Sequence, residues 1–240
     1  MNWRVFRKET TQSTNLDAAA GAPGDVFTAA VQTAGRGRLD HKWHSAPGEN
    51  LLMSAVVSAE GVAPEEAATL PLVAGLAAAR AVRRLSGAEA LVKWPNDVLV
   101  GGRKICGILC EKKGDNVIVG VGMNVLEREF PPDIAARTAS LSLLGADASV
   151  EDALSAVLEE LSAALSAWRT HGFENGIWPE IAKIDFLKGK ETEVFATDGD
   201  AETRRGECGG IASDGSLLVG GIPVWAGEAR VRPARRRFVV

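Results

Sequence analysis

Two lysines and an aspartate lie close together between Lys93 and Glu111. Lys93 stands shortly before Asp97, and Lys104 follows the turn signal Gly101-Gly102, which separates two strand-like runs. If this turn is tight, Asp97 and Lys104 become diagonal cross-strand neighbours, roughly 7–8 Å apart at the backbone. Fixed positive charge of this kind can bring anionic reactants together. Taken alone, the stretch is equally typical of an amphipathic hairpin with a solvated charged face.

The register of this hairpin decides which side chains share a face. A tight turn pairs Leu99 with Lys104. The same register pairs Asp97 with Cys106, and alternation along each strand then places all four side chains on one face. Gly107 follows inside the second strand, where an interior glycine often marks the close approach of a ligand or of another backbone.

A glycine-rich loop is the second candidate for chemistry, and it contains the sequence GRGR from Gly35 to Arg38. Glycines let the backbone approach an anion, and two arginines supply forked donors for phosphate or carboxylate. The loop lacks the Lys-Ser/Thr pair of a Walker A motif and does not meet the G-x-G-x-x-G pattern of dinucleotide-binding proteins. On its own, GRGR favours a flexible basic loop.

Three polar residues, Ser13, Thr14 and Asn15, precede an alanine-rich run. Such residues are helix-start signals, and a helix N-cap is the simpler explanation of them in isolation. A helix start also offers hydroxyl groups and free N–H groups to a polar ligand head.

The elements that must position these residues follow from the hydrophobic pattern. Strands are predicted at residues 3–8, 25–32, 51–59 and 116–125, around the hairpin region of 91–111. Helices are predicted at 64–85, where Pro71 kinks or divides the run, and at 149–169, with a capping box of Ser149 and Asp152. Beyond Lys190, short alternating runs between glycine pairs predict a small all-β module of about five strands. We therefore expect an α+β chain with one domain at 1–186 and a second, all-β domain at 187–240.

Composition excludes several classes of protein. The chain has 240 residues and a net charge of −4, whereas a free-standing nucleic-acid binder is usually more basic. No apolar run is long enough to span a bilayer, and the start of the chain has no apolar signal core, so we expect a cytoplasmic protein.

Three cysteines without a CxxC pair indicate reduced thiols, and His41 and His44 have no obvious third ligand for zinc. The oligomeric state is left open.

Taken together, the motifs resemble those of the biotin protein ligases. STN, QTAGRGR, KWPND, GRK followed by GIL, and VGVGMNV occur in one order over nearly the whole chain. The resemblance implies a mixed sheet flanked by helices and a C-terminal SH3-like β-barrel. It implies that biotin and Mg-ATP form biotinyl-5′-adenylate, and that a lysine of a biotin carboxyl carrier domain, as in acetyl-CoA carboxylase, then receives the biotin. The similarity is to the monofunctional type without an N-terminal DNA-binding domain, so DNA binding is not expected.

The resemblance also implies roles for individual residues. Lys104 contacts the biotin carboxylate, Arg38 closes on the substrates, and Asp97 positions the nucleophile or Mg²⁺. The residues implied to hold biotin are Ser13, Thr14, Asn15, Gln32, Arg36, Gly37, Arg38, Lys104 and Gly107. The residues implied to hold ATP or the adenylate are Gly35, Arg36, Arg38, Lys93, Asn96, Asp97 and Asn124.

The glycine-rich loop departs from the family pattern. After GRGR the family continues with arginine, glycine and arginine, where this chain has Leu39-Asp40-His41. Asp40 puts phosphate contacts by this half of the loop in doubt, and the segment 127–140 has no tryptophan to cover adenine. Because the segment 33–48 has few apolar side chains to anchor it, we expect it to be mobile when empty and ordered with biotinyl-adenylate.

Two other functions remain open at this point. The first is a lipoate or octanoate ligase of the same superfamily, and the second is a biotin-binding regulator without catalysis. Gln32 and the pair Ser13-Thr14 favour a ureido ring, because amides and hydroxyls both donate and accept. The charged residues Lys93, Asp97 and Lys104 favour catalysis, because binding alone does not need them.

Overall fold

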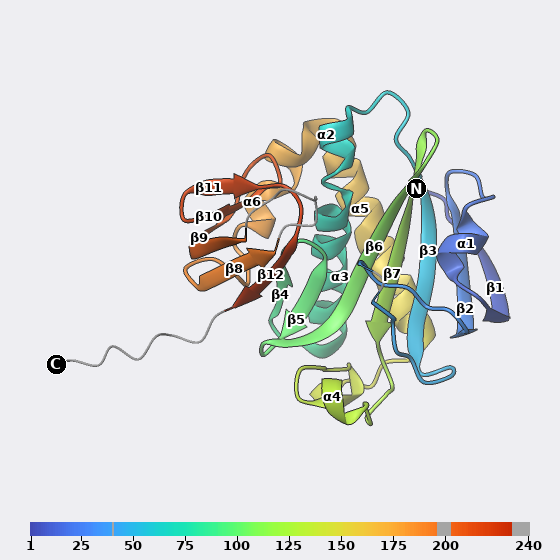
Figure 1. Cartoon of the computed structure of the whole chain (residues 1–240). Coiled ribbons are helices and arrows are strands. Elements are labelled where there is room, and N and C mark those ends of the chain that lie inside the picture. The colour runs from blue at the N-terminus through green and yellow to red at the C-terminus, as the bar shows by residue number, and fades with distance from the viewer. Residues whose placement is uncertain (40, 196–202, 232–240) are drawn as a thin grey trace.

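The structure is a computed structural model that describes residues 1–39, 41–195 and 203–231. In this part of the chain, a seven-stranded sheet runs in the order β1-β2-β3-β7-β6-β5-β4, and a five-stranded sheet in the order β11-β10-β9-β8-β12 (Figure 1). The first sheet is mixed, since β1 and β2 are parallel and the other neighbours are antiparallel. The predicted α+β class and the small module of five strands are therefore confirmed.

The bounds of the elements agree closely with the hydrophobic pattern. The strands of the first sheet are β1 (Arg4–Thr11), β2 (Asp25–Gln32), β3 (Asn50–Ser58), β4 (Ala90–Lys93), β5 (Asp97–Val100), β6 (Arg103–Lys113) and β7 (Asn116–Asn124). Those of the second sheet are β8 (Glu191–Phe195), β9 (Arg204–Ile211), β10 (Leu217–Val219), β11 (Ile222–Val224) and β12 (Glu228–Val231). The helices are α1 (Thr14–Ala18), α2 (Pro64–Ala67), α3 (Leu70–Ser86), α4 (Pro132–Ala135), α5 (Val150–Gly176) and α6 (Trp178–Ile181), with a 3₁₀ turn at Ser142–Leu144.

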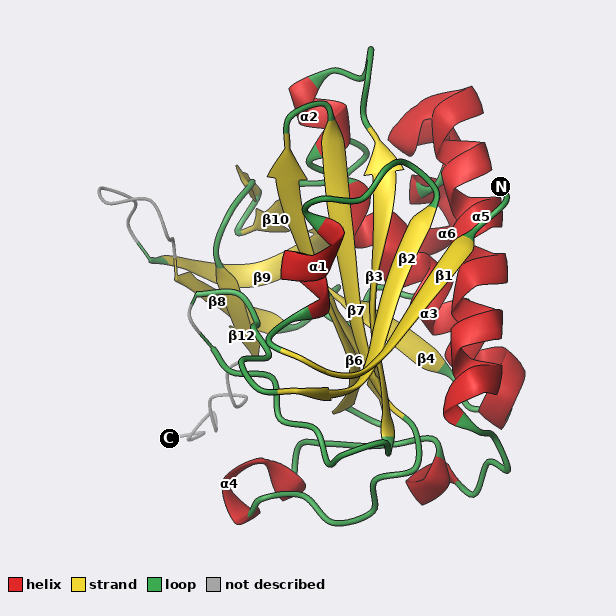
Figure 2. Ribbon diagram, turned by 90° about the vertical axis from the view of Figure 1, so that its right-hand side faces the viewer, coloured by secondary structure: helices red, strands yellow, loops and turns green. Residues whose placement is uncertain are grey.

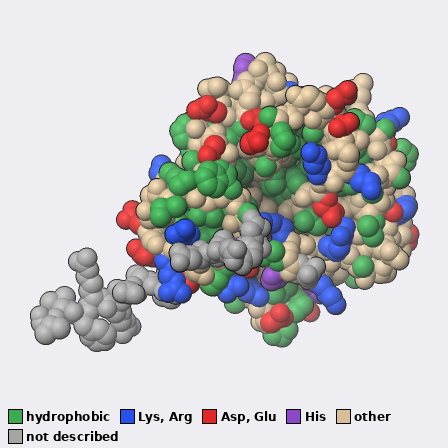
Figure 3. All heavy atoms as spheres, turned by 45° about the horizontal axis from the view of Figure 1, so that its top comes forward, with side chains coloured by type: hydrophobic (Ala, Val, Ile, Leu, Met, Phe, Trp, Pro, Cys, Tyr) green, Lys and Arg blue, Asp and Glu red, His purple; other side chains and the backbone are tan. Residues whose placement is uncertain are grey.

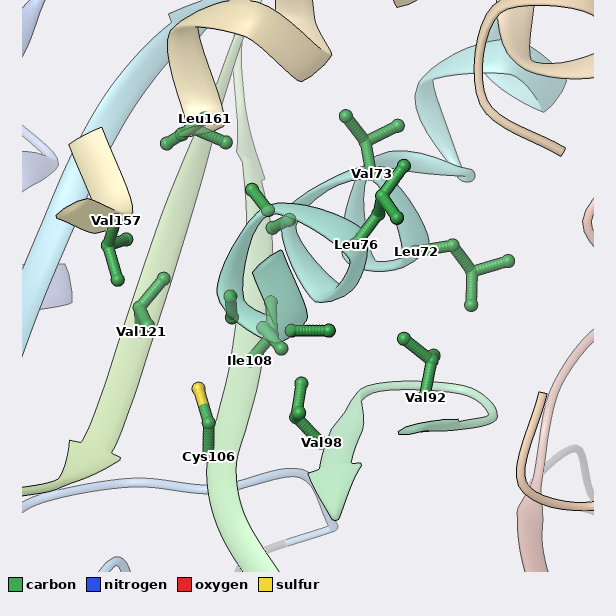
Figure 4. Close-up of a cluster of buried hydrophobic side chains, with 14 of the residues drawn as sticks. Leu72, Val73, Leu76, Val92, Val98, Cys106, Ile108, Val121, Val157 and Leu161 are labelled. Atoms are coloured by element: carbon green, nitrogen blue, oxygen red, sulfur yellow. The ribbon is translucent and has the colours of Figure 1, made fainter. Parts of the chain in front are cut away.

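Helices cover the two faces of the first sheet unequally. Figure 2 shows α3 and α5 together on one side and the short α1 on the other. On the α1 side, Ala18 packs against Val56 and Ile118 in a small cluster separate from the main core. On the α3 side, Leu76 and its neighbours face Val98 and Ile108 of the sheet (Figure 4). The main core therefore lies under the larger helices, and the opposite face stays available for a site.

The helix boundaries have local causes. The predicted helix at 64–85 is divided into α2 and α3, with Pro71 in the first turn of α3, where its missing N–H leaves no hydrogen bond unmade. Ser149 and Asp152 form the predicted capping box. Gly172 interrupts α5 at a φ of 71°, close to the predicted helix end.

A β-bulge corrects the predicted register of the central hairpin. Leu99 pairs with Lys104 as predicted, but the register shifts beyond this pair, so Cys106 lies opposite Val98 and Asp97 opposite Gly107. The predicted pairing of Asp97 with Cys106 is therefore wrong. An extra residue in one strand of a pair reverses the alternation that follows it. Cys106 consequently points into the core together with Val98 (Figure 4), and it does not share the face of Lys104.

One continuous hydrophobic core extends beneath both sheets. Leu187, Val194 and Leu217 of the C-terminal part belong to the same cluster as the buried residues of α3 and α5. The indole Nε1 of Trp94 also donates to the carbonyl of Gly215, at 3.1 Å. The division into domains at residue 187 stays a prediction, since the packing is shared across it.

Among the described residues, none of the helices combines the length and the apolar character that crossing a bilayer requires.

Candidate active site

A cavity of about 1040 Å³ opens between the first sheet and the strand β12. It is lined by every predicted site residue except Gly35, together with residues that the sequence did not single out. Gly35 lies behind the lining, where an added Cβ would approach the carbonyl of Trp43 and the side chain of Gln32. The fold thus brings the predicted residues together, while their individual roles stay predictions.

Short polar side chains gather at one end of the cavity, which we call the polar end. Its lining consists of Ser13, Thr14, Asn15 and Gln32, and it includes Ser54 and Glu111, which are hydrogen-bonded to this lining. The helix α1 does begin at Thr14, as predicted, with Ser13 as its N-cap residue. The Ser13 side chain makes no capping hydrogen bond, so the simple N-cap explanation does not account for it.

The polar end is held by hydrogen bonds within the protein. Thr14 donates to Oε1 of Gln32 through its backbone N–H at 2.7 Å and through its hydroxyl at 3.1 Å. The Ser54 hydroxyl lies 2.7 Å from the Thr14 hydroxyl and 2.5 Å from Oδ1 of Asn15. The side chains of Thr14, Asn15 and Gln32 are therefore each fixed by a neighbour. A hydroxyl or amide bonded on one side still offers a second donor or acceptor to a ligand.

Glu111 joins the glycine-rich loop to the polar end, and the sequence analysis missed it. It accepts from Nδ2 of Asn15 at 2.6 Å and from Nη2 of Arg36 at 3.1 Å. It has no signal in the sequence, because a glutamate near the end of a strand and next to other charged residues is typical of a solvent-exposed position. The ion pair draws the Arg36 guanidinium toward Asn15, so the contact of Arg36 with ATP stays a prediction.

The other end of the cavity, which we call the charged end, contains Arg38, Lys93, Asp97 and Lys104. Lys104 Nζ lies 2.6 Å from Oδ1 of Asp97, as the hairpin predicts. Burial lowers the pKa of Lys93, and the charge of Lys104 adds to this effect while Asp97 opposes it. Burial likewise lowers the pKa of Arg38, whose Nη1 donates to the carbonyl of Gly227. The basic groups here outnumber the carboxylates of Asp97 and the nearby Glu228, which makes this end suited to anions.

Trp43 is a second residue that the sequence analysis missed. Gly107 and Gly122 are cross-strand partners in β6 and β7, and they form a flat patch on the sheet. The Trp43 ring lies on this patch so closely that a Cβ on either glycine would be within 3 Å of it. Lys104 Nζ is 5.5 Å from the ring centroid, which permits a cation–π contact. Gly107 was predicted to allow close approach, and an aromatic ring is what approaches.

The backbone of Lys104 is clamped by the segment after β7. Its N–H donates to the carbonyl of Arg137, and its carbonyl accepts from the N–H of Ala139, both at 2.8 Å. The Asn124 amide donates to the carbonyl of Ala139 at 2.9 Å, and the Asn96 amide donates to that of Ile108 at 2.7 Å. Both asparagines therefore position backbone around the cavity, and direct contact with adenine stays a prediction.

The strand β12 brings Glu228 and Arg230 to the cavity from the far end of the chain. Burial alone would raise the pKa of Glu228, but the hydrogen bond and charge of Arg230, with His41 and Lys93, lower it below its usual value. No local pattern could have found these residues, because they reach the site only through the packing of the second sheet on the first.

A magnesium ion fits the charged end only as a companion of phosphates. The described residues contain no cluster of three His, Cys, Asp or Glu side chains that could hold a metal. Asp97 supplies a single carboxylate, and it is already paired with Lys104. Mg²⁺ commonly takes one or two carboxylates and completes its shell with water and substrate phosphate.

Surface charge gives no sign of a nucleic-acid site on the face drawn in Figure 3, where acidic and basic side chains are interspersed. The absence of DNA binding stays a prediction from net charge. Asp40, the acidic departure in the glycine-rich loop, lies outside the described residues.

Comparisons with known proteins agree with this geometry. Residues 4–124 match the Biotin/lipoate A/B protein ligase family. The bifunctional ligase/repressor BirA of Bacillus subtilis is 34% identical over 142 residues, a match that covers 55% of this chain but only 43% of that protein. The biotin–[acetyl-CoA-carboxylase] ligase of Paracoccus denitrificans is 33% identical over 233 residues, covering 88% of this chain and 92% of that protein. The solved biotin protein ligase from Aquifex aeolicus, in complex with biotin and ATP, has a TM-score of 0.83 at 28% identity and covers 95% of this chain and 98% of that chain.

Proposed function

This chain belongs to the biotin/lipoate A/B protein ligase family, and we propose that within it the protein is a biotin protein ligase. It would activate biotin with Mg-ATP and then transfer biotin to a lysine of a carrier domain. The single observation that supports this most strongly is the pairing of the two ends in one cavity. A neutral polar head fits one end, and the anionic groups of an acid and a nucleotide fit the other.

The polar end favours biotin over lipoate or octanoate. A ureido ring has two N–H donors and a carbonyl acceptor, and it must find partners for all three when buried. Thr14 and Gln32 provide hydroxyl and amide groups at the cavity, and they are already oriented by each other and by the buried Ser54. The dithiolane of lipoate and the tail of octanoate would leave the remaining donor and acceptor positions of these groups unused and out of reach of water, which is unfavourable for buried polar groups.

The charged end supports the first chemical step. A carboxylate oxygen of biotin attacks the α-phosphorus of ATP, and pyrophosphate leaves with the electron pair of the broken P–O bond. In this proposal Lys104 contacts the biotin carboxylate, and Lys93 and Arg38 neutralise the phosphates. Mg²⁺ enters with ATP as part of the substrate, and Asp97 is available to its coordination shell. Positive charge fixed before the reaction lowers the barrier because it need not reorganise.

The second step transfers the acyl group. The ε-amine of the acceptor lysine attacks the acyl carbon of biotinyl-5′-AMP and forms a C–N bond. The acyl C–O bond to the phosphate breaks, AMP leaves with the electron pair, and the nitrogen loses a proton. Lys104 is placed to stabilise the acyl oxygen, and Asp97 beside it is placed to position the incoming amine. The name of the Paracoccus relative supports the carrier domain of acetyl-CoA carboxylase as the acceptor.

Exchange of labelled pyrophosphate into ATP tests the proposal. We expect exchange that depends on biotin and on Mg²⁺, and none with lipoate or octanoate. Exchange with lipoate but not with biotin would overturn the choice of substrate. Tight binding of biotin without any exchange would instead indicate the non-catalytic regulator.

A further inference from the structure

Glu127 is a buried carboxylate that the proposed reaction does not use. Its side chain is 2% exposed. It lies just beyond β7, at the start of the segment that clamps the backbone of Lys104. A buried carboxylate is unfavourable unless donors surround it, so its partners identify the arrangement that it stabilises.

The partners of Glu127 lie at the C-terminal end of the glycine-rich loop and just after it. Oε1 accepts from Nε2 of His44 at 2.9 Å, since a carboxylate can only accept. Oε2 accepts from the backbone N–H of Ala46 at 3.2 Å and from the amide of Asn50. Two of the three donors therefore belong to residues 44–46, and they reach Glu127 only when this part of the loop lies against the segment after β7.

Asn50, at the start of β3, also binds the backbone of the segment after β7. Its Oδ1 accepts from the N–H of Val125 at 2.9 Å, and the carbonyl of Glu49 accepts from the N–H of Leu126 at 2.8 Å. The start of β3 thus fixes the backbone on which Glu127 stands. The end of the loop is attached here through the Glu127 side chain and through Asn50, whose amide also donates to Oγ of Ser45 at 3.3 Å.

Each segment joined by Glu127 leads to a different part of the cavity. One residue before His44, the Trp43 ring covers Gly107 and Gly122 and approaches Lys104. On the other side, the segment after β7 contains Ala139, which is bonded to both Lys104 and Asn124. Movement of the loop therefore changes the donors around Glu127, and movement of the segment after β7 changes the position of Glu127. In both cases Glu127 transmits the change to the other segment.

We propose that Glu127 is a positioning residue that couples binding of the acid substrate to binding of the nucleotide. The inference rests on the proposed function, because it assumes that the loop closes on biotin and that the segment after β7 closes on ATP. Coupling of this kind is reciprocal: if ATP increases the affinity for biotin, biotin increases the affinity for ATP by the same factor.

Calorimetric titration measures this coupling directly. The dissociation constant of biotin is determined with and without saturating α,β-methylene-ATP, a non-hydrolysable analogue, and the reverse experiment is done with biotin. For the unaltered protein we expect each ligand to tighten the other by at least about fivefold. In Glu127→Gln we expect this factor to fall close to one, while the thermal midpoint and the affinity for the analogue alone change little.

Two further variants separate coupling from folding. His44→Ala removes only a half-exposed partner of Glu127, so it should fold normally and still lose most of the coupling, even if Glu127→Gln proves unstable. Glu129→Gln changes an exposed acid two residues away and should keep full coupling. Full coupling in a folded Glu127→Gln or His44→Ala variant would overturn the inference, as would independent binding of the two ligands by the unaltered protein. Absence of any biotin binding by the unaltered protein would overturn the proposed function as well.

Discussion

The two ends of the cavity differ in how their side chains are stabilised before a ligand binds. At the polar end, Thr14, Gln32 and Ser54 are bonded to one another, so the side chains are held in place within the protein. At the charged end, basic groups outnumber the carboxylates of Asp97 and Glu228, and burial already lowers the pKa of Lys93. The polar side chains already have partners within the protein, so the polar end recognises a ligand by its shape and its hydrogen-bonding groups. The charged end carries an excess of positive charge, which is neutralised when anions bind.

This difference predicts that substitutions at the charged end affect the rate, whereas those at the polar end affect the affinity for biotin.

The largest effect is expected from Lys104→Ala. Removing a charge aimed at the reacting centre should lower the rate of biotin-dependent pyrophosphate exchange about 10²–10³-fold, with little change in the thermal midpoint, since the side chain is partly exposed. Lys112→Ala, an exposed position on the same strand, serves as the control and should leave the rate unchanged. Full activity of Lys104→Ala, or its failure to fold, would mean that the lysine is structural.

Ser54→Ala should have the next largest effect. The substitution removes the hydrogen bonds of Ser54 to Thr14 and to Oδ1 of Asn15, and so loosens the polar end. A loss of about 1.4 kcal/mol corresponds to a KM for biotin about tenfold higher, whereas the KM for ATP should hardly change. Steady-state kinetics with each substrate in turn separates the two. Equal increases in both constants would contradict the distinction between the ends.

A smaller change concerns the order of the glycine-rich loop. Arg36 and Arg38 repel each other when no anion is bound, and a bound anion supplies charge-assisted hydrogen bonds to both. Amide hydrogen exchange over residues 33–39 and 41–48 should therefore slow when biotin and ATP are added. Strong, equal protection in both states would show that the ion pair of Arg36 with Glu111 already fixes the loop without ligand.

The smallest effect is expected at the thiols behind the site. Burial raises the pKa of Cys106 and of Cys110 to about 12, and for Cys106 this outweighs the opposite effect of the Lys104 charge. Because the thiolate is the reactive form, only about one thiol in 10⁴ is reactive at pH 8. Iodoacetamide followed by mass spectrometry should label neither cysteine until the protein unfolds, in the presence or absence of Lys104. Rapid labelling of the native protein would show that the positive charges of the charged end lower the pKa of the buried thiols more than burial raises it.

The sequence predicted the elements well because their signals are local. Alternation located the strands, Pro71 marked a helix break, and Gly107 indicated close approach. The bulge after Lys104 could not be seen, because one extra residue in a strand leaves no mark on composition. The predicted pairing of Asp97 with Cys106 failed for this reason alone.

The missed site residues share a different cause. Glu111, Glu127 and Glu228 look like ordinary surface acids in the sequence, and each acquires its role from residues distant along the chain. Trp43 could have been noticed, since a tryptophan in a loop opposite two strand glycines suggests a ring lying on a flat patch. Contacts of β12 with the cavity depend on how the second sheet packs, which no short motif records.

The core shared by the two sheets has a consequence for how the molecule unfolds. Because Leu187, Val194 and Leu217 are buried in the same cluster as α3, neither sheet can open without exposing apolar surface of the other. The chain should therefore melt in a single cooperative transition, with equal calorimetric and van't Hoff enthalpies. A ligand seated on the first sheet should then protect the remote turns of the second against proteolysis, although it does not touch them.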